Sequence, residues 1–178
     1  MAVMIPEKPN IFHESSLEDV MFKALEKLPE EYYVFHSFRI TKIVSHTIHE
    51  SETDFIIFHA KKGILCLEAK AGAVSYQDGR WLYGNGQAMN NGGPFNQASA
   101  NKWKLMQYIA ESPIGYINER LKYIHGVWFP SLTENKLDNI QMPPEGDRSL
   151  VIGMEALEDP KKYIDSLFSL AIQTGTVT

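Results

Sequence analysis

Cysteine is nearly absent from this sequence: Cys66 is the only one among 178 residues. A lone cysteine excludes a disulfide framework and a cysteine-based zinc site, and it fits a reducing compartment. Apolar runs are short, and none reaches the roughly 18 residues that a membrane-spanning helix needs. The first residues contain no basic segment followed by a long apolar one, so they do not resemble a secretory signal. We therefore expect a cytoplasmic protein with no membrane contact.

Two widespread catalytic motifs are missing as well. The sequence contains no G-x-x-x-x-G-K-[ST], so the chain does not bind ATP through a P-loop. It contains no G-x-S-x-G, and no serine, histidine and acid stand out together as a nucleophilic triad. Internal repeats and low-complexity tracts are lacking too. These absences argue against a P-loop ATPase and against a serine hydrolase.

Basic residues are in the minority, and the net charge is −5 at pH 7. This balance argues against a generally basic nucleic-acid-binding protein. Residues 60–104 nevertheless hold six lysines and arginines against two acids, whereas residues 131–165 hold four against eight. A phosphate-bearing ligand could meet a locally positive surface in the first segment, although scattered surface charge explains the counts equally well. The candidate substrate contacts in that segment are Lys61, Lys62, Arg80, Lys102 and Lys104.

The most informative stretch runs from Glu52 to Lys70, ETDFIIFHAKKGILCLEAK. It predicts two apolar strands joined by a three-residue turn at 61–63. This turn sets a register in which the opposed pairs are Phe58–Ile64, Ile56–Cys66 and Asp54–Glu68. Because side chains alternate between faces, Asp54, Glu68 and Lys70 should leave one face together. Opposed Cβ atoms lie roughly 4.5–5.5 Å apart, so the two carboxylates could share one divalent cation.

Both strands of this pair are apolar on both faces, which is typical of strands covered on each side in α/β proteins. Charged residues at the ends of such strands need partners. An ion pair of Lys70 with one carboxylate is the purely structural interpretation. It leaves the second carboxylate unexplained, so a site is favoured. Two carboxylates without a cysteine favour Mg²⁺ or Mn²⁺ over zinc.

The other elements expected around this strand pair follow in chain order. A helix should run from a Ser15–Glu18 capping box to Leu28, followed by a strand over 32–47, bent or split near Thr41, and a short connection. A hairpin over 73–83, a glycine- and asparagine-rich loop over 84–93, and a helix from Pro94 to about Glu111 should come next. Further strands are expected at 122–130 and 149–152, and helices over 155–171, interrupted at Pro160.

Four polar side chains on these elements are weaker candidates. Glu18 lies at the edge of the buried face of the first helix, where a capping role and a role in the site have equal weight. Gln97 falls in the first turns of the helix that begins at Pro94, beside Asn101 and Lys104. His46 and His49 lie in the expected connection, where contact with solvent is commoner than metal ligation.

The ordered motifs resemble those of the nuclease-related domain, NERD, within the PD-(D/E)XK nuclease superfamily. The matching pieces are Ser51–Asp54 (SETD), Leu67–Lys70 (LEAK), Gly72, Gly79–Trp81 (GRW) and Pro94–Ala98 (PFNQA). The resemblance spans roughly residues 15–130. It departs from the family pattern at Gly93, where asparagine is usual, and no glycine precedes Glu18.

The resemblance implies an α/β fold with a restriction-endonuclease-like core. Its central mixed sheet would be an antiparallel meander plus later strands, flanked by helices. Residues 1–14 would form an N-terminal arm and residues 15–130 the nuclease-like core. Residues 131–178 would add a strand and helices that complete the same domain.

The resemblance also implies metal-dependent phosphodiester hydrolysis on DNA, with Mg²⁺ or Mn²⁺ as cofactor. Carried over by position, Asp54 and Glu68 would bind the metal and Lys70 would be the catalytic lysine, with Gln97 and Glu18 as the other catalytic residues. Domains of this kind often form the nuclease module of a larger DNA-processing or defence protein, so DNA and a helicase or similar protein are the expected partners. The competing interpretation is a non-catalytic DNA-binding or interaction module that retains the fold.

Overall fold

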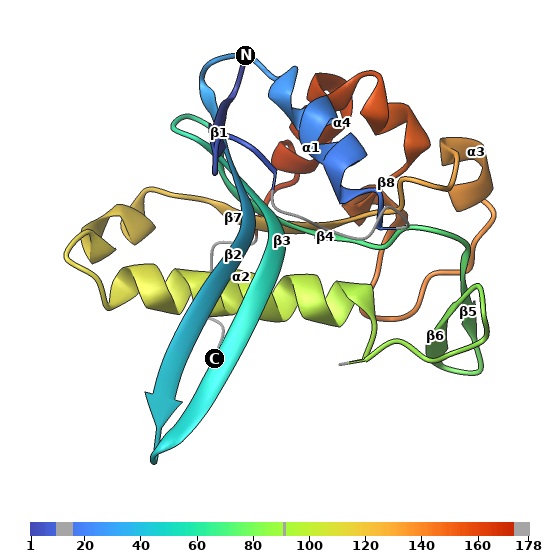
Figure 1. Cartoon of the computed structure of the whole chain (residues 1–178), viewed down its shortest axis with the longest axis horizontal. Coiled ribbons are helices and arrows are strands. Elements are labelled where there is room, and N and C mark those ends of the chain that lie inside the picture. Colours follow the sequence, from blue (N-terminus) through green and yellow to red (C-terminus); the bar gives the residue numbers. More distant parts are fainter. Residues whose placement is uncertain (10–15, 91, 173–178) are drawn as a thin grey trace.

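Six strands form one mixed sheet, in the order β1–β2–β3–β4–β7–β8 (Figure 1). The computed structural model describes residues 1–9, 16–90 and 92–172. In sheet order the strands are Val3–Ile5, Tyr32–Val44, Thr47–His59, Gly63–Ala69, Tyr123–Trp128 and Val151–Ile152. β2, β3 and β4 are antiparallel neighbours, whereas β1, β7 and β8 pair in parallel with β2, β4 and β7. The expected antiparallel meander with later strands is confirmed.

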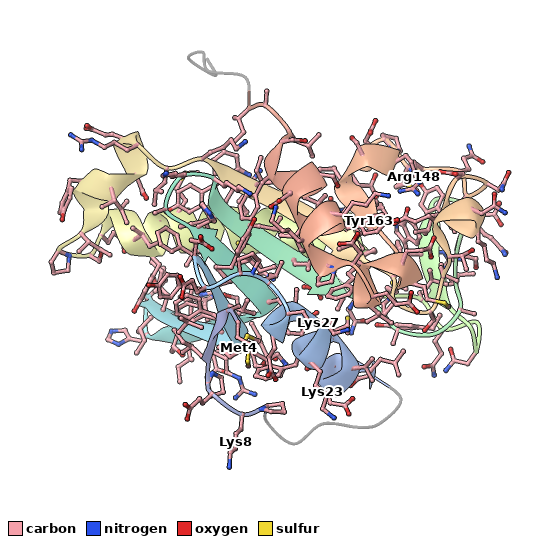
Figure 2. All side chains as sticks on the ribbon, turned by 90° about the horizontal axis from the view of Figure 1, so that it is seen from above. Met4, Lys8, Lys23, Lys27, Arg148 and Tyr163 are labelled. Atoms are coloured by element: carbon pink, nitrogen blue, oxygen red, sulfur yellow. The ribbon has the colours of Figure 1, made fainter. Side chains whose placement is uncertain are left out.

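Helices cover both faces of this sheet. α1 (Glu18–Glu26) and α4 (Pro160–Phe168) pack on one face, and α2 (Pro94–Ala110) packs on the other (Figure 1). Figure 2 looks onto the α1 and α4 layer, in which Lys27, the residue directly after α1, donates a hydrogen bond to the carbonyl of Leu157 at 3.3 Å. The shorter elements are α3 (Glu134–Leu137) and the 3-10 turns η2 (Gly115–Glu119), η3 (Arg148–Leu150) and η4 (Met154–Leu157). Within the described residues, no helix combines the length and apolarity that crossing a bilayer requires.

β4 is the central strand of the core, and its sequence explains why. Leu65 and Leu67 point into the core beneath α1 and α4, whereas Ile64 and Cys66 point into the core above α2. All four side chains are buried, as expected for a strand that is apolar on both faces. Burial raises the pKa of the Cys66 thiol to about 12, so this cysteine is a packing residue and not a nucleophile.

The register between β3 and β4 is as predicted. Phe58 lies opposite Ile64, and Ile56 lies opposite Cys66. The turn comprises residues 60–62, one position earlier than expected, because Gly63 already pairs with His59. Gly63 has φ +113°, and a Cβ atom there would lie 2.2 Å from the carbonyl oxygen of Lys122. Only glycine fits at the point where this turn enters β4.

The prediction of a short connection after the strand at 32–47 is wrong. β2 and β3 instead continue as one long hairpin, which we call the β2–β3 arm (Figure 1). The turn consists of Ser45 and His46 alone, both with positive φ (50° and 62°), as in a two-residue hairpin turn. His49 therefore belongs to β3. Thr47 and Ile48 are β-branched residues that favour an extended chain. β3 therefore begins at Thr47 and includes the polar residues that follow Ile48.

Some of the other predicted helix and strand boundaries are confirmed, and others differ from the structure. Val3–Ile5 of the N-terminal arm adds an edge strand, which no periodicity signalled. Ser15 lies outside the described residues, and the first N–H of α1, that of Glu18, donates to Ser16 Oγ at 3.4 Å. The chain bends at Ser37, which has φ +54°, and not at Thr41. The hairpin of β5 (Val74–Gln77) and β6 (Arg80–Tyr83) and the break before Pro160 are confirmed.

Candidate active site

A small cavity lies at the C-terminal end of β4, where the sheet stops. Its volume is about 260 Å³, and it brings together four of the predicted catalytic side chains from three parts of the chain. Glu18 comes from the first turn of α1, Asp54 from β3, Glu68 from the end of β4 and Lys70 from the residues that follow it. Tyr83, the last residue of β6, also lines the cavity.

Asp54 and Glu68 form a carboxyl pair that lines this cavity, and each carboxyl acts on the pKa of the other. The backbone pairing of β3 with β4 ends one position earlier, at Phe55 and Leu67. At the next position the Asp54 carboxylate takes over, accepting the backbone N–H of Ala69 at 2.9 Å. Side-chain bonding thus replaces ladder bonding at the strand end, which holds the Asp54 carboxylate beside that of Glu68.

Glu68 is the least exposed residue of the cavity, with 6% of its surface exposed. Its Oε1 lies 3.4 Å from Lys70 Nζ. Its Oε2 is buried and receives no hydrogen bond from an N–H or O–H donor of the described residues. A buried carboxylate oxygen without a donor costs free energy, so the lysine alone does not satisfy this carboxylate.

The pKa values of Asp54 and Glu68 also show that the ionised carboxylate pair is poorly stabilised in the metal-free protein. Burial, together with the nearby Asp54 charge, raises the pKa of Glu68 to about 8, although Lys70 acts to lower it. Burial raises the pKa of Asp54 to about 6, against the lowering effect of the Ala69 N–H. Like-charged neighbours in a low-dielectric site cannot both ionise easily. A second positive charge between them would remove this penalty.

A divalent cation is the group that fits this arrangement. Within the described residues no group of three or more histidine, cysteine, aspartate or glutamate side chains could hold a metal ion. Mg²⁺, however, keeps several waters and binds through one or two carboxylates plus substrate oxygens. Asp54 and Glu68 supply two hard oxygen ligands, and the Glu68 oxygen that accepts no hydrogen bond from the described residues is available to a cation. The residues therefore suit Mg²⁺ or Mn²⁺ better than zinc.

A second cavity of about 430 Å³ shares Glu68 with the first. Four polar residues of α2 line it: Asn96, Gln97, Asn101 and Lys104. Gln97 Nε2 donates to the carbonyl of Asn90 at 2.7 Å, which ties α2 to the preceding loop. Asn101 is buried and donates to the carbonyl of Glu52 at 3.0 Å, which anchors β3 two residues before Asp54.

A third cavity, of about 390 Å³, lies next to the second cavity along α2. It shares Glu50, Ser51 and Lys104 with the second cavity, and it lies between α2 and the β2–β3 arm. Tyr108 and Gln107 line it from the helix, and His49 lines it from the arm. The second and third cavities, which share three residues and lie along α2, are together called the α2 groove, and Glu68 lines both this groove and the first cavity.

Of the five predicted substrate contacts, only Lys104 lines the α2 groove. Lys61 and Lys62 lie in the turn before β4, at the opposite end of that strand from Glu68. At about 3.3 Å per residue this separation is roughly 17 Å. Lys62 Nζ is engaged there by Asp165 Oδ1 at 2.9 Å.

The remaining two contacts lie elsewhere. Arg80 is exposed at the start of β6. Lys102 Nζ lies 3.0 Å from His125 Nδ1 and lines a separate cavity beneath β7. Positive charge clustered in the sequence was therefore not clustered in space.

Sequence reasoning missed three residues that shape the site. His36 of β2 forms a hydrogen bond with Glu18, Tyr83 lines the first cavity, and Asn101 anchors β3. Asn101 had a signal, because it shares a helix face with Gln97 at a spacing of four residues. His36 and Tyr83 had none, since their positions depend on how β2 and β6 pack near the end of β4.

Gly93, where the family pattern differs, has a structural reason here. It is buried and has φ +97°, and a Cβ atom there would lie 2.3 Å from Trp81 Cδ1. Trp81 in turn packs against Phe95, with ring centroids 5.8 Å apart. Asparagine at this position would collide with the indole, so the hairpin of β5 and β6 and the start of α2 pack closely only with glycine.

The fold and the site define a mixed α/β protein with an acidic cavity, a lysine and a polar helix face at one sheet end. The sequence model of NERD, the nuclease-related domain, matches residues 14–130. This match covers well over half of the chain, and the protein belongs to the nuclease-related domain family. The expectation drawn from the SETD, LEAK and PFNQA motifs is confirmed.

The crystal structure of protein VC1899 from Vibrio cholerae has 13% sequence identity and a TM-score of 0.41, and the match covers 85% of this chain and 32% of that one. This chain therefore spans about a third of that protein's length. No match was found among curated proteins.

Proposed function

We propose that this chain is a Mg²⁺- or Mn²⁺-dependent DNA nuclease that hydrolyses phosphodiester bonds. The observation that carries the proposal is the buried Glu68 carboxylate, which lies beside Asp54 in the cavity and has one oxygen that no donor of the described residues reaches. Burying two neighbouring carboxyl groups lowers the folding stability of the metal-free protein. Such perturbed ionisable groups are common at functional sites. Membership of the nuclease-related domain family supports the same reaction class.

The division of labour follows from the contacts. A divalent cation bound by Asp54 and Glu68 would lower the pKa of a water molecule and neutralise charge on the phosphate. Lys70 places an ammonium group beside Glu68 in the same cavity, where it can donate to the attacking water or to a phosphate oxygen. Asp54 is fixed by the Ala69 N–H, so one of the two carboxylates is already oriented before substrate binds.

A cleavage assay with Lys70→Ala tests this proposal. The wild-type chain should cut DNA with Mg²⁺ or Mn²⁺ and should stop after chelation. Lys70→Ala should lower the rate by about 100-fold, the loss typical of one positioned electrostatic group. Lys61→Ala, at the far end of β4, is the matched control and should cut like the wild type. Equal cleavage by all three proteins, or cleavage by none, would count against the proposal.

The α2 groove is the proposed path of the substrate, and Lys104 is its expected phosphate contact. Lys104→Ala should weaken DNA binding uniformly across sequences and lower the slope of log K against log salt by about one. Binding should be measured by fluorescence anisotropy at several salt concentrations, with single- and double-stranded oligonucleotides in separate titrations. Lys61→Ala again serves as the control, and an equal effect of both variants would place the DNA elsewhere.

Two further parts of the proposal concern context. The buried, unpaired Cys66 agrees with the cytoplasmic location proposed from cysteine usage. A helicase or other DNA-processing protein is the proposed partner, since the acidic net charge suits a nuclease that receives DNA from another protein. A pull-down of the purified chain on immobilised single-stranded DNA, with no partner protein added, would test whether the chain binds DNA by itself.

A further inference from the structure

A buried histidine lies directly behind the cavity. His36 of β2 has no exposed side-chain surface, and its Nε2 lies 2.9 Å from Glu18 Oε2. Its ring stacks on Phe55, with centroids 4.9 Å apart and planes 25° apart, and meets the edge of Phe22 at 5.7 Å. The imidazole is therefore held in one orientation by packing on two sides, and it offers Nε2 to the carboxylate.

The direction of this hydrogen bond follows from chemistry. An ionised carboxylate only accepts hydrogen bonds, so the imidazole donates its Nε2–H to Glu18. The Glu18 side chain is 24% exposed, while that of His36 is fully buried. The bond thus runs from the core outward and fixes a carboxylate that would otherwise be free to turn in solvent.

Glu18 faces the carboxyl pair. It lines the same cavity as Asp54, Glu68 and Lys70, and its charge acts to raise the pKa of Asp54. Within the described residues it does not join Asp54 and Glu68 in a group that could hold an ion directly. Its contact with a hydrated cation would therefore pass through water, which is how outer carboxylates commonly act at Mg²⁺ sites.

We propose that His36 is a positioning residue of the active site, which fixes the Glu18 carboxylate so that it binds water beside Asp54 and Glu68. The inference rests on the proposed function. Ser37, next in the chain, has φ +54°, and it marks where β2 changes the face it presents. His36 packs on Phe22 under α1, whereas Phe38 contacts Tyr108 of α2. Glu18 and His36 can meet because this bend ends the α1-facing part of β2 beside the cavity.

The test replaces His36 by phenylalanine, which keeps the buried ring and removes the N–H donor. His36→Phe should weaken Mn²⁺ binding, measured by calorimetry, by about tenfold and lower kcat by about 10- to 100-fold, as loss of an outer-shell partner commonly does. The KM for DNA should stay within about twofold of the wild-type value. His36→Gln keeps a donor at similar reach and should recover most of both losses. In a Glu18→Ala background, His36→Phe should have no further effect.

His59 provides a matched control at the far end of β3. It is also buried, its ring meets that of Tyr32 at 4.8 Å, and its Nδ1 accepts the N–H of Lys61 at 3.1 Å. His59→Phe should leave Mn²⁺ affinity and kcat unchanged. If the wild type cleaves DNA and His36→Phe cleaves it equally well, or acts on the Glu18→Ala background as strongly as on the wild type, only this inference fails. If the wild type neither binds Mn²⁺ nor cleaves DNA, the proposed function fails with it.

Discussion

Glu68→Gln should abolish metal-dependent DNA cleavage, with a loss of about 10³-fold or more, and should not destabilise the protein. The amide keeps the shape of the carboxyl group but cannot ionise, so it removes a metal ligand and also the repulsion with Asp54. At pH 8 we expect the Tm of the metal-free variant to equal or exceed that of the wild type. A functional carboxylate that costs stability behaves in this way.

The competing interpretation makes the opposite prediction for stability. If Glu68 served only as the ion-pair partner of Lys70, its replacement would leave a buried lysine unpaired and would lower the Tm. Glu134→Gln is the control, because Glu134 pairs with Arg148 and accepts the N–H of Gly153 far from the cavity. That variant should lose stability and keep its activity. Calorimetric melting and a plasmid-cleavage assay on both variants would separate the two interpretations.

Mn²⁺ affinity should rise steeply with pH, on the order of 10⁴-fold between pH 5 and pH 8. The metal needs both carboxylates ionised, and binding therefore displaces protons from groups with a pKa of about 8 at Glu68 and about 6 at Asp54. One displaced proton changes the apparent Kd about tenfold per pH unit, and two protons change it about 100-fold below pH 6. Titration calorimetry in buffers with different ionisation enthalpies would count the protons released.

The same shifts set the pH dependence of stability without metal. Because the folded state raises the pKa of Glu68 from 4.5 to about 8, it binds a proton more tightly than the unfolded chain does. The stabilisation of the folded state by the Glu68 proton is complete below pH 4.5 and is lost as the pH rises towards 8. The Tm of the metal-free protein should therefore fall over this range, and Glu68→Gln should flatten the fall. A wild-type Tm that rises from pH 5 to pH 8 would contradict the assignment.

The sequence by itself determined the strand pair and its register. Alternation along two short apolar strands and a tight turn are local properties, so Ile56 opposite Cys66 and the nearness of Asp54 to Glu68 could be read directly. Motif order likewise identified the family. The length of the β2–β3 arm could not be read, because polar residues such as His49 and Glu50 are equally suited to an exposed strand and to a loop.

Tertiary structure alone decided which side chains meet at the end of β4. Lys104 reaches the α2 groove while Lys61 lies at the other end of the strand, although both belong to one basic segment of the sequence. Glu18 gains a partner in His36, which is 18 residues away in the chain, because α1 packs across β2. Such meetings depend on long-range packing of elements, and the periodicity of one segment carries no information about it.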